Sequence, residues 1–155
     1  MDKEDRILYD DGHTIVTRDM IKTLGSNKFI YIEIIDAWAF ILSRKSIKEN
    51  DKRIFFSNNA FNMLCQDDAY IDDTQEITPE IRLDKFMETL DYWIADCCIQ
   101  SLKGVQLFFF LVYAYHHFYV LVINTKSKSI EVIDNRPLLE NVEFSSKYHD
   151  WPEQI

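Results

Sequence analysis

The segment from Val105 to Asp134 constrains the fold more than any other part of the chain. It contains two apolar runs rich in aromatic and β-branched residues, then a short polar break over residues 125–128, and then a third run from Ser129 to Ile133. Runs of this composition, separated by short polar breaks, are typical of adjacent β-strands. We therefore predict a sheet at the centre of the fold, with its last two strands joined in a hairpin.

The turn of this hairpin decides which residues face one another. If Thr125 and Lys126 form a two-residue turn, His117 lies directly opposite Asp134. A four-residue loop over residues 124–127 gives the same pairing and avoids positive φ angles at Thr125 and Lys126. A register shifted by two residues would leave the two side chains diagonal but still on one face of the sheet.

An imidazole beside a carboxylate is the arrangement of a general base and its orienting acid. Opposed Cβ atoms lie roughly 5 Å apart. A carboxylate at that position can accept a hydrogen bond from one imidazole nitrogen, which fixes the tautomer and leaves the other nitrogen to act as a base. The alternative is that His117 and Asp134 only cap the end of the hairpin. His116 is expected to lie in a loop.

Composition limits the partners and the compartment. The net charge of −9 makes nucleic acid an unexpected partner, because phosphate binding requires a basic surface. No apolar run reaches the roughly 20 residues of a membrane span, so we expect no membrane partner. The three cysteines lack the spacing of a metal site, and we expect neither a metal nor a cofactor. The N-terminus lacks the pattern of a signal or transit peptide, which favours an intracellular location in the nucleus or the cytoplasm.

The rest of the chain is predicted to surround this sheet, so that the 155 residues form one α+β domain with a central mixed or antiparallel sheet flanked by helices. The helix expected over residues 29–44 would bury Ile34, Trp38 and Ile41 and expose Asp36 and Ser43. The other predicted elements are an N-terminal hairpin with an Asp11-Gly12 turn, a short helical turn capped by Thr17, a strand over 53–56, helices over 58–66, 78–101 and 143–155, and an acidic loop over 67–78.

This order of elements, together with several of its residues, resembles the ubiquitin-like-protein-specific protease family, which includes the SUMO proteases. The resemblance runs from about Ile15 to Asp134. It is carried by the helix block Ile34-Ile35-Asp36-Ala37-Trp38, by the strand that begins His117-Phe118, and by the following strand that ends at Asp134. The resemblance implies a cysteine-protease-like fold and a cysteine-type peptidase. Its partner would be a SUMO-like modifier or its conjugates, cleaved after the Gly-Gly tail.

The resemblance also implies roles for four residues. His117 would be the general base that deprotonates a cysteine, and Asp134 would orient it. Phe118 and Phe29 stand where the family has two tryptophans that hold the Gly-Gly tail, so they are the expected substrate-binding residues. Tyr31-Ile32 replaces the Asn-Asp pair that usually precedes the family's helix.

The nucleophile is the part of this site that the sequence lacks. In the family, the catalytic cysteine follows the aspartate in an Asp-Cys-Gly segment, whereas no cysteine follows His117 here. We therefore expect a C-terminally incomplete catalytic domain that is inactive by itself. One alternative is a non-catalytic pseudo-protease module that binds a ubiquitin-like modifier or another protein partner. A second is an enzyme of papain-like order that uses Cys98. Cys97 and Cys65 are expected to be buried thiols.

Overall fold

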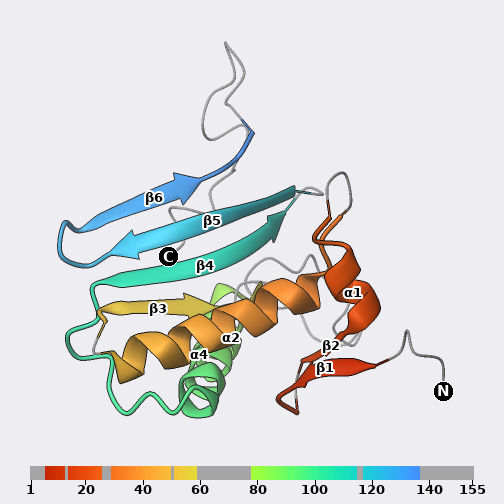
Figure 1. The fold of residues 1–155 in the computed structure, drawn as a ribbon. Helices are drawn as coiled ribbons and strands as arrows, with labels where there is room; N and C mark the ends of the chain where they lie inside the picture. The colour runs from red at the N-terminus through yellow and green to blue at the C-terminus, as the bar shows by residue number, and fades with distance from the viewer. Residues whose placement is uncertain are drawn as a thin grey trace.

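The computed structural model describes residues 6–12, 14–25, 29–49, 51–58, 78–114 and 117–136 (Figure 1). The segments 59–77 and 137–155, on which two predicted helices and most of the acidic loop fall, lie outside the described residues. Within the described ranges, every helix falls short of the length and apolar character needed to cross a bilayer. The elements are β1 (Ile7–Asp10), β2 (Ile15–Thr17), α1 (Arg18–Lys22), α2 (Ile32–Lys48), β3 (Arg53–Phe56), α4 (Pro79–Asp96), β4 (Leu107–Ala114), β5 (His117–Asn124) and β6 (Ser129–Ile133).

The central sheet is mixed, with its strands in the order β3-β4-β5-β6. β3 and β4 run parallel, in a register that pairs Ile54 with Phe108. The β4–β5 and β5–β6 pairs are antiparallel. α2 and α4 both lie against this sheet (Figure 1). The α+β class and the mixed central sheet expected from the sequence are therefore confirmed.

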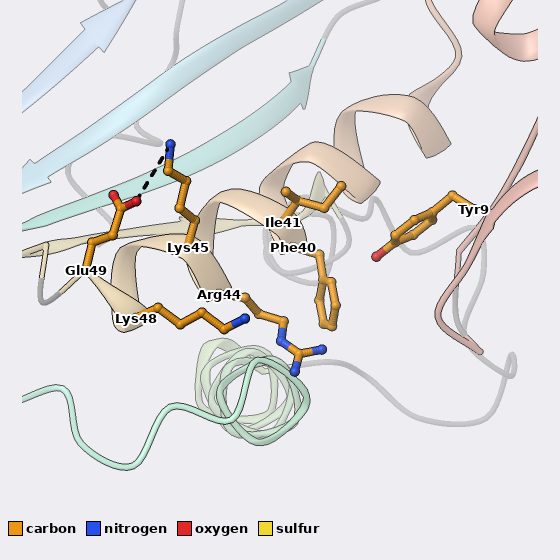
Figure 2. Close-up of a pocket in the computed structure, with 7 residues that line it drawn as sticks. All are labelled: Tyr9, Phe40, Ile41, Arg44, Lys45, Lys48 and Glu49. Atoms are coloured by element: carbon orange, nitrogen blue, oxygen red, sulfur yellow. Dashed lines mark ion pairs between the residues drawn. The ribbon is translucent and has the colours of Figure 1, made fainter.

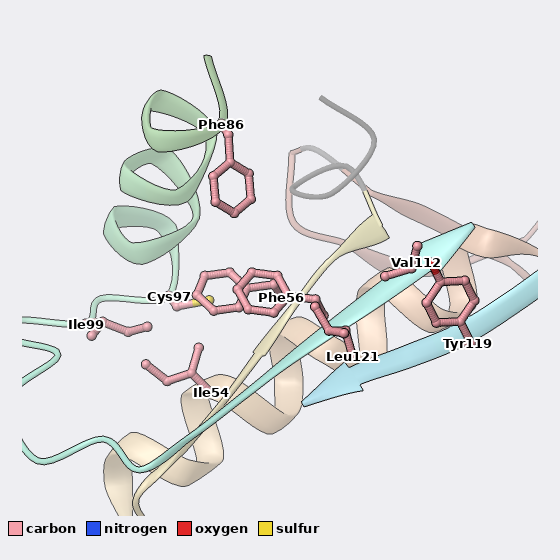
Figure 3. Packing of buried hydrophobic residues seen from close by; sticks show 9 residues of the cluster. Ile54, Phe56, Phe86, Cys97, Ile99, Val112, Tyr119 and Leu121 are labelled. Atoms are coloured by element: carbon pink, nitrogen blue, oxygen red, sulfur yellow. The ribbon is translucent and has the colours of Figure 1, made fainter. Parts of the chain in front are cut away.

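The main hydrophobic core lies between one face of the sheet and α4 (Figure 3). Side chains alternate between the two faces of a strand, so every second residue of β3, β4 and β5 enters this core. α4 begins at the predicted N-cap Thr78 and ends at Asp96, earlier than expected, because Cys98 has a φ of 58° that cannot continue a helix. The buried residues of the cluster are Ile54, Phe56, Phe86, Cys97, Ile99, Phe110, Val112, Tyr119 and Leu121.

α2 lies along the free edge of β3 and presents small side chains to it. Ala39, Ser43 and Ser46 are all buried. The Ser43 Oγ donates a hydrogen bond to the Phe55 carbonyl at 2.7 Å and accepts one from the Phe55 N–H at 2.9 Å. Trp93 of α4 donates its indole N–H to the same carbonyl at 3.0 Å. An edge strand presents unpaired backbone groups, and these side chains satisfy the edge of β3 at Phe55.

This packing reverses part of the surface predicted for α2. Trp38 and Ile41, expected in the core, are 54% and 41% exposed, whereas Asp36 and Ser43, expected on the solvent side, are 7% and 0% exposed. Small polar side chains let the helix approach the strand and bond its backbone, which a tryptophan at the same place would prevent. Ile34, by contrast, is buried as predicted.

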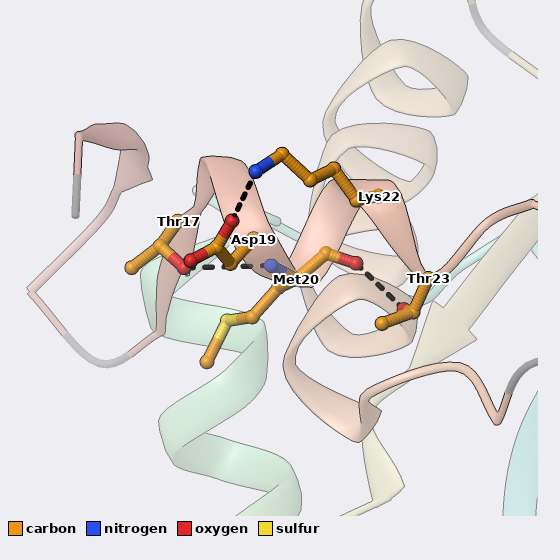
Figure 4. Close-up of polar contacts among 5 residues, drawn as sticks. All are labelled: Thr17, Asp19, Met20, Lys22 and Thr23. Atoms are coloured by element: carbon orange, nitrogen blue, oxygen red, sulfur yellow. Dashed lines mark hydrogen bonds and ion pairs between the residues drawn. The ribbon is translucent and has the colours of Figure 1, made fainter. Parts of the chain in front are cut away.

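The N-terminal hairpin of β1 and β2 leads directly into α1 and packs against α2. The Thr17 hydroxyl accepts a hydrogen bond from the Met20 N–H at 3.5 Å, which confirms the predicted N-cap (Figure 4). An ion pair between Lys22 and Asp19 at 2.6 Å lies on the exposed side of the same helix (Figure 4). The hairpin is held to α2 by a second, smaller apolar cluster of Val16, Ile34 and Ala37.

Replacing Ser43 with Ala is expected to lower the free energy of unfolding by about 2 kcal/mol, because the Phe55 N–H loses its partner and the carbonyl loses one of its two donors. Urea denaturation measures the change. The matched control is Ser127→Ala, since the Ser127 hydroxyl bonds Ser129 in an exposed loop, and its effect should stay below about 0.5 kcal/mol. Equal effects of the two substitutions would contradict the role given to Ser43.

Candidate functional site

The strands of the sheet have a common end where β4 finishes and β5 begins. We call this end of the strands the His117 edge. β4 ends there at Ala114, which pairs with His117 at the start of β5, and β6 ends there at Ile133. β3 is parallel to β4 and points toward the same end of the sheet, but it stops at Phe56, which pairs with Phe110, four residues before Ala114. Asp36, near the start of α2, bonds the N–H of Asn58 just after β3, which brings the N-terminal end of α2 toward this edge as well (Figure 1).

The register of β5 and β6 differs by two residues from the predicted one. Val120 pairs with Ile133. The same register carried one step further sets Asp134 opposite Tyr119, and the prediction that it lies directly opposite His117 is wrong. Because the shift is even, the backbone positions of His117 and Asp134 remain diagonal neighbours on one face, with a separation of roughly 7–8 Å.

The hairpin loop accounts for this shift. Asn124 stays in β5 and pairs with Ser129, so the loop has four residues as predicted but begins one residue later. The Asn124 Oδ1 accepts hydrogen bonds from the N–H groups of Lys126 and Ser127, each at 3.1 Å. Such side-chain bonds from asparagine start a turn. Lys128 closes the loop with a φ of 55°.

Asp134 is held at its position by the turn that follows β6. Its Oδ1 accepts a hydrogen bond from the Arg136 N–H at 2.7 Å, and the residue is half-buried. His117 is placed by its backbone in β5, while the orientation of its side chain lies outside the described part of the chain. A side chain as long as that of histidine can reach a diagonal neighbour across a strand pair.

The two aromatic residues predicted to hold a substrate tail lie in different settings. Phe118 follows His117 on β5 and therefore belongs to the opposite face. Its ring contacts that of Tyr113, with 4.5 Å between the ring centroids. Phe29 precedes α2 and is 98% exposed. Phe29 is therefore an exposed ring three residues before α2, whereas Phe118 is held by its neighbour.

Cys97 is a buried thiol, as predicted. It is 1% exposed and lies in the main core (Figure 3). Burial raises the pKa of the Cys97 thiol to about 12, and the nearby Asp96 carboxylate acts in the same direction. The thiolate is the nucleophilic form of cysteine, so this pKa makes Cys97 unreactive at neutral pH. Cys65 lies outside the described residues.

Cys98 is exposed, but it lies at the other end of the sheet. Together with Ile54 and Val105 it lines a surface cavity beside the start of β3 and β4. β4 spans eight residues from that end to the His117 edge, so Cys98 and His117 are separated by about 20 Å. A nucleophile and its base must come within hydrogen-bond reach of one another, and the geometry therefore opposes the papain-like alternative.

A buried polar cluster at the His117 edge was not predicted. Asp36, Asn58 and Ser57 are 7%, 6% and 4% exposed, and the Asn58 N–H donates to the Asp36 Oδ1 at 2.8 Å. Within the described part of the chain, the Asn58 Oδ1 is buried without a hydrogen-bond partner. In the sequence, the burial of Asp36 is indicated only by its spacing of seven residues from Ser43, which puts both side chains on the stripe of α2 that faces β3.

Among the described carboxyl groups, that of Asp36 has the largest shift in pKa. The net effect of its surroundings raises the pKa of Asp36 to about 6: burial is the main cause, the hydrogen bond from the Asn58 N–H lowers the pKa, and the nearby Glu33 carboxylate raises it. A buried carboxyl group with a raised pKa beside a sheet edge is a feature of many functional sites, although structural networks also produce it.

Comparison with models of known protein families, with curated proteins and with solved structures finds no match to this chain. The interpretation of the His117 edge therefore rests on its residues and its geometry. The register places the backbone positions of His117 and Asp134 on one face of neighbouring strands, and the buried pair of Asp36 and Asn58 lies toward the same end of the sheet.

Asp36 is expected to make the fold less stable as the pH rises. Its pKa is about 6 in the folded protein and about 4 in an unfolded chain, so between these values the folded state binds more protons. The free energy of unfolding should therefore fall from about pH 4 to about pH 6, by about 3 kcal/mol in all. Urea denaturation across this range should give a flatter profile for Asp36→Asn.

The control for this experiment is Asp84→Asn, because Asp84 is an exposed carboxylate on α4. This variant should keep the slope of the unsubstituted protein. If the free energy of unfolding changed with pH equally in the unsubstituted protein and in Asp36→Asn, the raised pKa of Asp36 would be contradicted.

Proposed function

We propose that this chain carries the histidine and aspartate of a cysteine-type peptidase site of the ubiquitin-like-protease kind. The bond cleaved would be the one after the Gly-Gly tail of a SUMO-like modifier. The observation that carries the proposal is the register. His117 opens β5 and Asp134 follows β6, and their backbone positions are diagonal on one face of neighbouring strands. The proposed site of action is the nucleus or the cytoplasm, since a thiol nucleophile needs reducing conditions.

In this proposal His117 acts as the base and Asp134 sets its tautomer. The imidazole removes the proton of a cysteine thiol, which must come from outside the described residues because Cys97 is buried and Cys98 is distant. The thiolate then attacks the carbonyl carbon of the last glycine. The bond to the leaving amine breaks as that amine takes the proton from the imidazolium, which leaves a thioester. Water then hydrolyses the thioester, with His117 again acting as the base. Asp134 stays ionised and stabilises the imidazolium.

The aromatic residues fit the recognition of a diglycine tail. Glycine has no side chain, so a flat ring can approach its backbone closely. Phe118, supported by Tyr113, would supply a fixed wall, and the exposed Phe29 would supply the second. A narrow slot between two rings would exclude tails with larger side chains.

A non-catalytic module that binds a ubiquitin-like modifier is the second candidate function. It is favoured by the positions of the described cysteines, because Cys97 is buried and Cys98 lies about 20 Å from His117. Since neither described thiol lies beside His117, a module of this kind would bind a modifier without cleaving it.

Replacing Asp134 with Asn is expected to let the His117 ring adopt both of its neutral tautomers. In the unsubstituted protein, the ¹⁵N NMR signals of the His117 ring should report one neutral tautomer, because a carboxylate accepts from only one N–H. The variant should give a mixture. The control is Glu131→Gln, an exposed position on the opposite face of β6, and it should leave the signals unchanged. Identical His117 signals in Asp134→Asn and the unsubstituted protein would contradict the pairing.

The 155-residue chain is expected to bind a SUMO-like modifier that ends in Gly-Gly without hydrolysing a fluorogenic group attached to that tail. Phe29→Ala should weaken binding about tenfold, because an exposed aromatic ring often carries much of an interface's affinity. The control is Tyr92→Ala, a 70% exposed ring on α4, which should stay within about twofold. Fluorescence anisotropy measures binding, and release of the fluorophore measures cleavage.

One result of this assay would remove the proposal, and another would correct the expected inactivity of the chain. Absence of binding to every ubiquitin-like modifier tried would remove both candidate functions. Cleavage that is lost in His117→Ala would establish the peptidase and overturn the expectation that the chain alone is inactive.

A further inference from the structure

A groove between β1 and the C-terminal half of α2 is separate from the His117 edge. Its volume is about 480 Å³, within the range of sites that hold small ligands or a few side chains of a peptide (Figure 2). The lining residues are Tyr9 of β1 and Phe40, Ile41, Arg44, Lys45, Lys48 and Glu49 of the last turns of α2 or just after it.

The groove combines an apolar floor with a basic rim. Tyr9, Phe40 and Ile41 supply the floor, and the Tyr9 side chain points toward α2 (Figure 2). Trp38, which is 54% exposed, lies one turn before Ile41 on the same side of α2 and extends this apolar surface. Exposed aromatic and aliphatic side chains gathered in this way mark interaction surfaces.

The rim cations are available to an external anion. Within the described residues, no carboxylate lies within ion-pair distance of Arg44 or Lys48. Lys45 meets Glu49 only at 3.9 Å, and both side chains are more than half exposed, so this pair is weak. The Arg44 guanidinium lies over the Phe40 ring at 5.5 Å, which orients its N–H groups for a carboxylate.

The dipole of α2 explains only part of this pattern. Basic residues in the last turn of a helix, such as Lys45 and Lys48, interact favourably with its C-terminal end. That effect accounts neither for the apolar floor nor for an arginine stacked on Phe40. It also does not explain Arg44, which lies before the last turn and adds a third cation to the groove.

We propose that this groove binds an acidic segment of a partner protein, in which an aliphatic or aromatic residue lies among carboxylates. The apolar residue would fill the floor beside Phe40 and Ile41, and the carboxylates would pair with Arg44 and Lys48. Charge complementarity favours this occupant over a second copy of the chain, because two molecules of charge −9 repel each other.

The test is binding of a short fluorescent peptide that carries two central leucines flanked by glutamates. The unsubstituted protein should bind it, and a counterpart with lysine in place of glutamate should not bind. The double variant Arg44→Glu, Lys48→Glu should lose at least about tenfold in affinity, since each reversed charge removes an attraction and adds a repulsion. Affinity should also fall with rising salt.

The control variant makes the same change in net charge elsewhere. Lys103→Glu, Lys126→Glu replaces two exposed lysines outside the groove and should bind within about twofold of the unsubstituted protein. A peptide with serine in place of the leucines should bind more weakly, since it lacks the group that fills the floor. Circular dichroism checks that each variant is folded.

Three results would overturn the proposal. The first is no binding, and the second is an equal loss of affinity in the groove variant and the control. The third is a dimer in analytical ultracentrifugation that dissociates in Arg44→Glu, Lys48→Glu, because the occupant would then be a second copy of the chain. None of these measurements depends on the function proposed for the His117 edge.

Discussion

The bonding of α2 to the open edge of β3 determines how the rest of the structure is arranged. The Ser43 hydroxyl and the Trp93 indole both reach the Phe55 backbone, so two helices are fixed at one residue of the edge strand. α2 must run antiparallel to β3 to make this contact and the one between Asp36 and Asn58. Its N-terminal end is thereby brought toward the edge where β5 begins. A contact within the packed interior thus decides which residues can contribute to the candidate site.

The sequence predicts those elements whose signals are local. β3 and β6 have the predicted bounds, and Thr17 and Thr78 cap their helices as expected, because alternation and capping depend on near neighbours. The buried face of α2 was predicted wrongly at Trp38 and Asp36, since it depends on a strand edge that only the tertiary structure provides. The final turn of α4 was wrong for a similar reason, because no pattern announced the positive φ of Cys98.

The candidate site could be predicted in part because of the alternation of side chains along a strand. The loop position was wrong by one residue at each end, since the Asn124 side chain starts the turn later than expected. Such an error moves the register by two residues, which changes the distance between His117 and Asp134 but not the face they share. A register error of one residue would have put the two side chains on opposite faces of the sheet. The burial of Asp36 was not predicted, because its spacing from Ser43 indicates a buried stripe only when the edge of β3 is known, and its partner is a backbone N–H distant in sequence.

The two ends of α2 face different chemical environments, and the length of the helix keeps them apart. Asp36 and Lys48 are separated by about 18 Å along the axis, roughly twice the distance over which salt screens exposed charges at physiological ionic strength. The basic rim of the groove therefore has little direct effect on ionisation at the His117 edge. Any influence of one end on the other must pass through the position of α2 itself. Ser43 lies between them, so its bonds to β3 are where such a movement would be resisted.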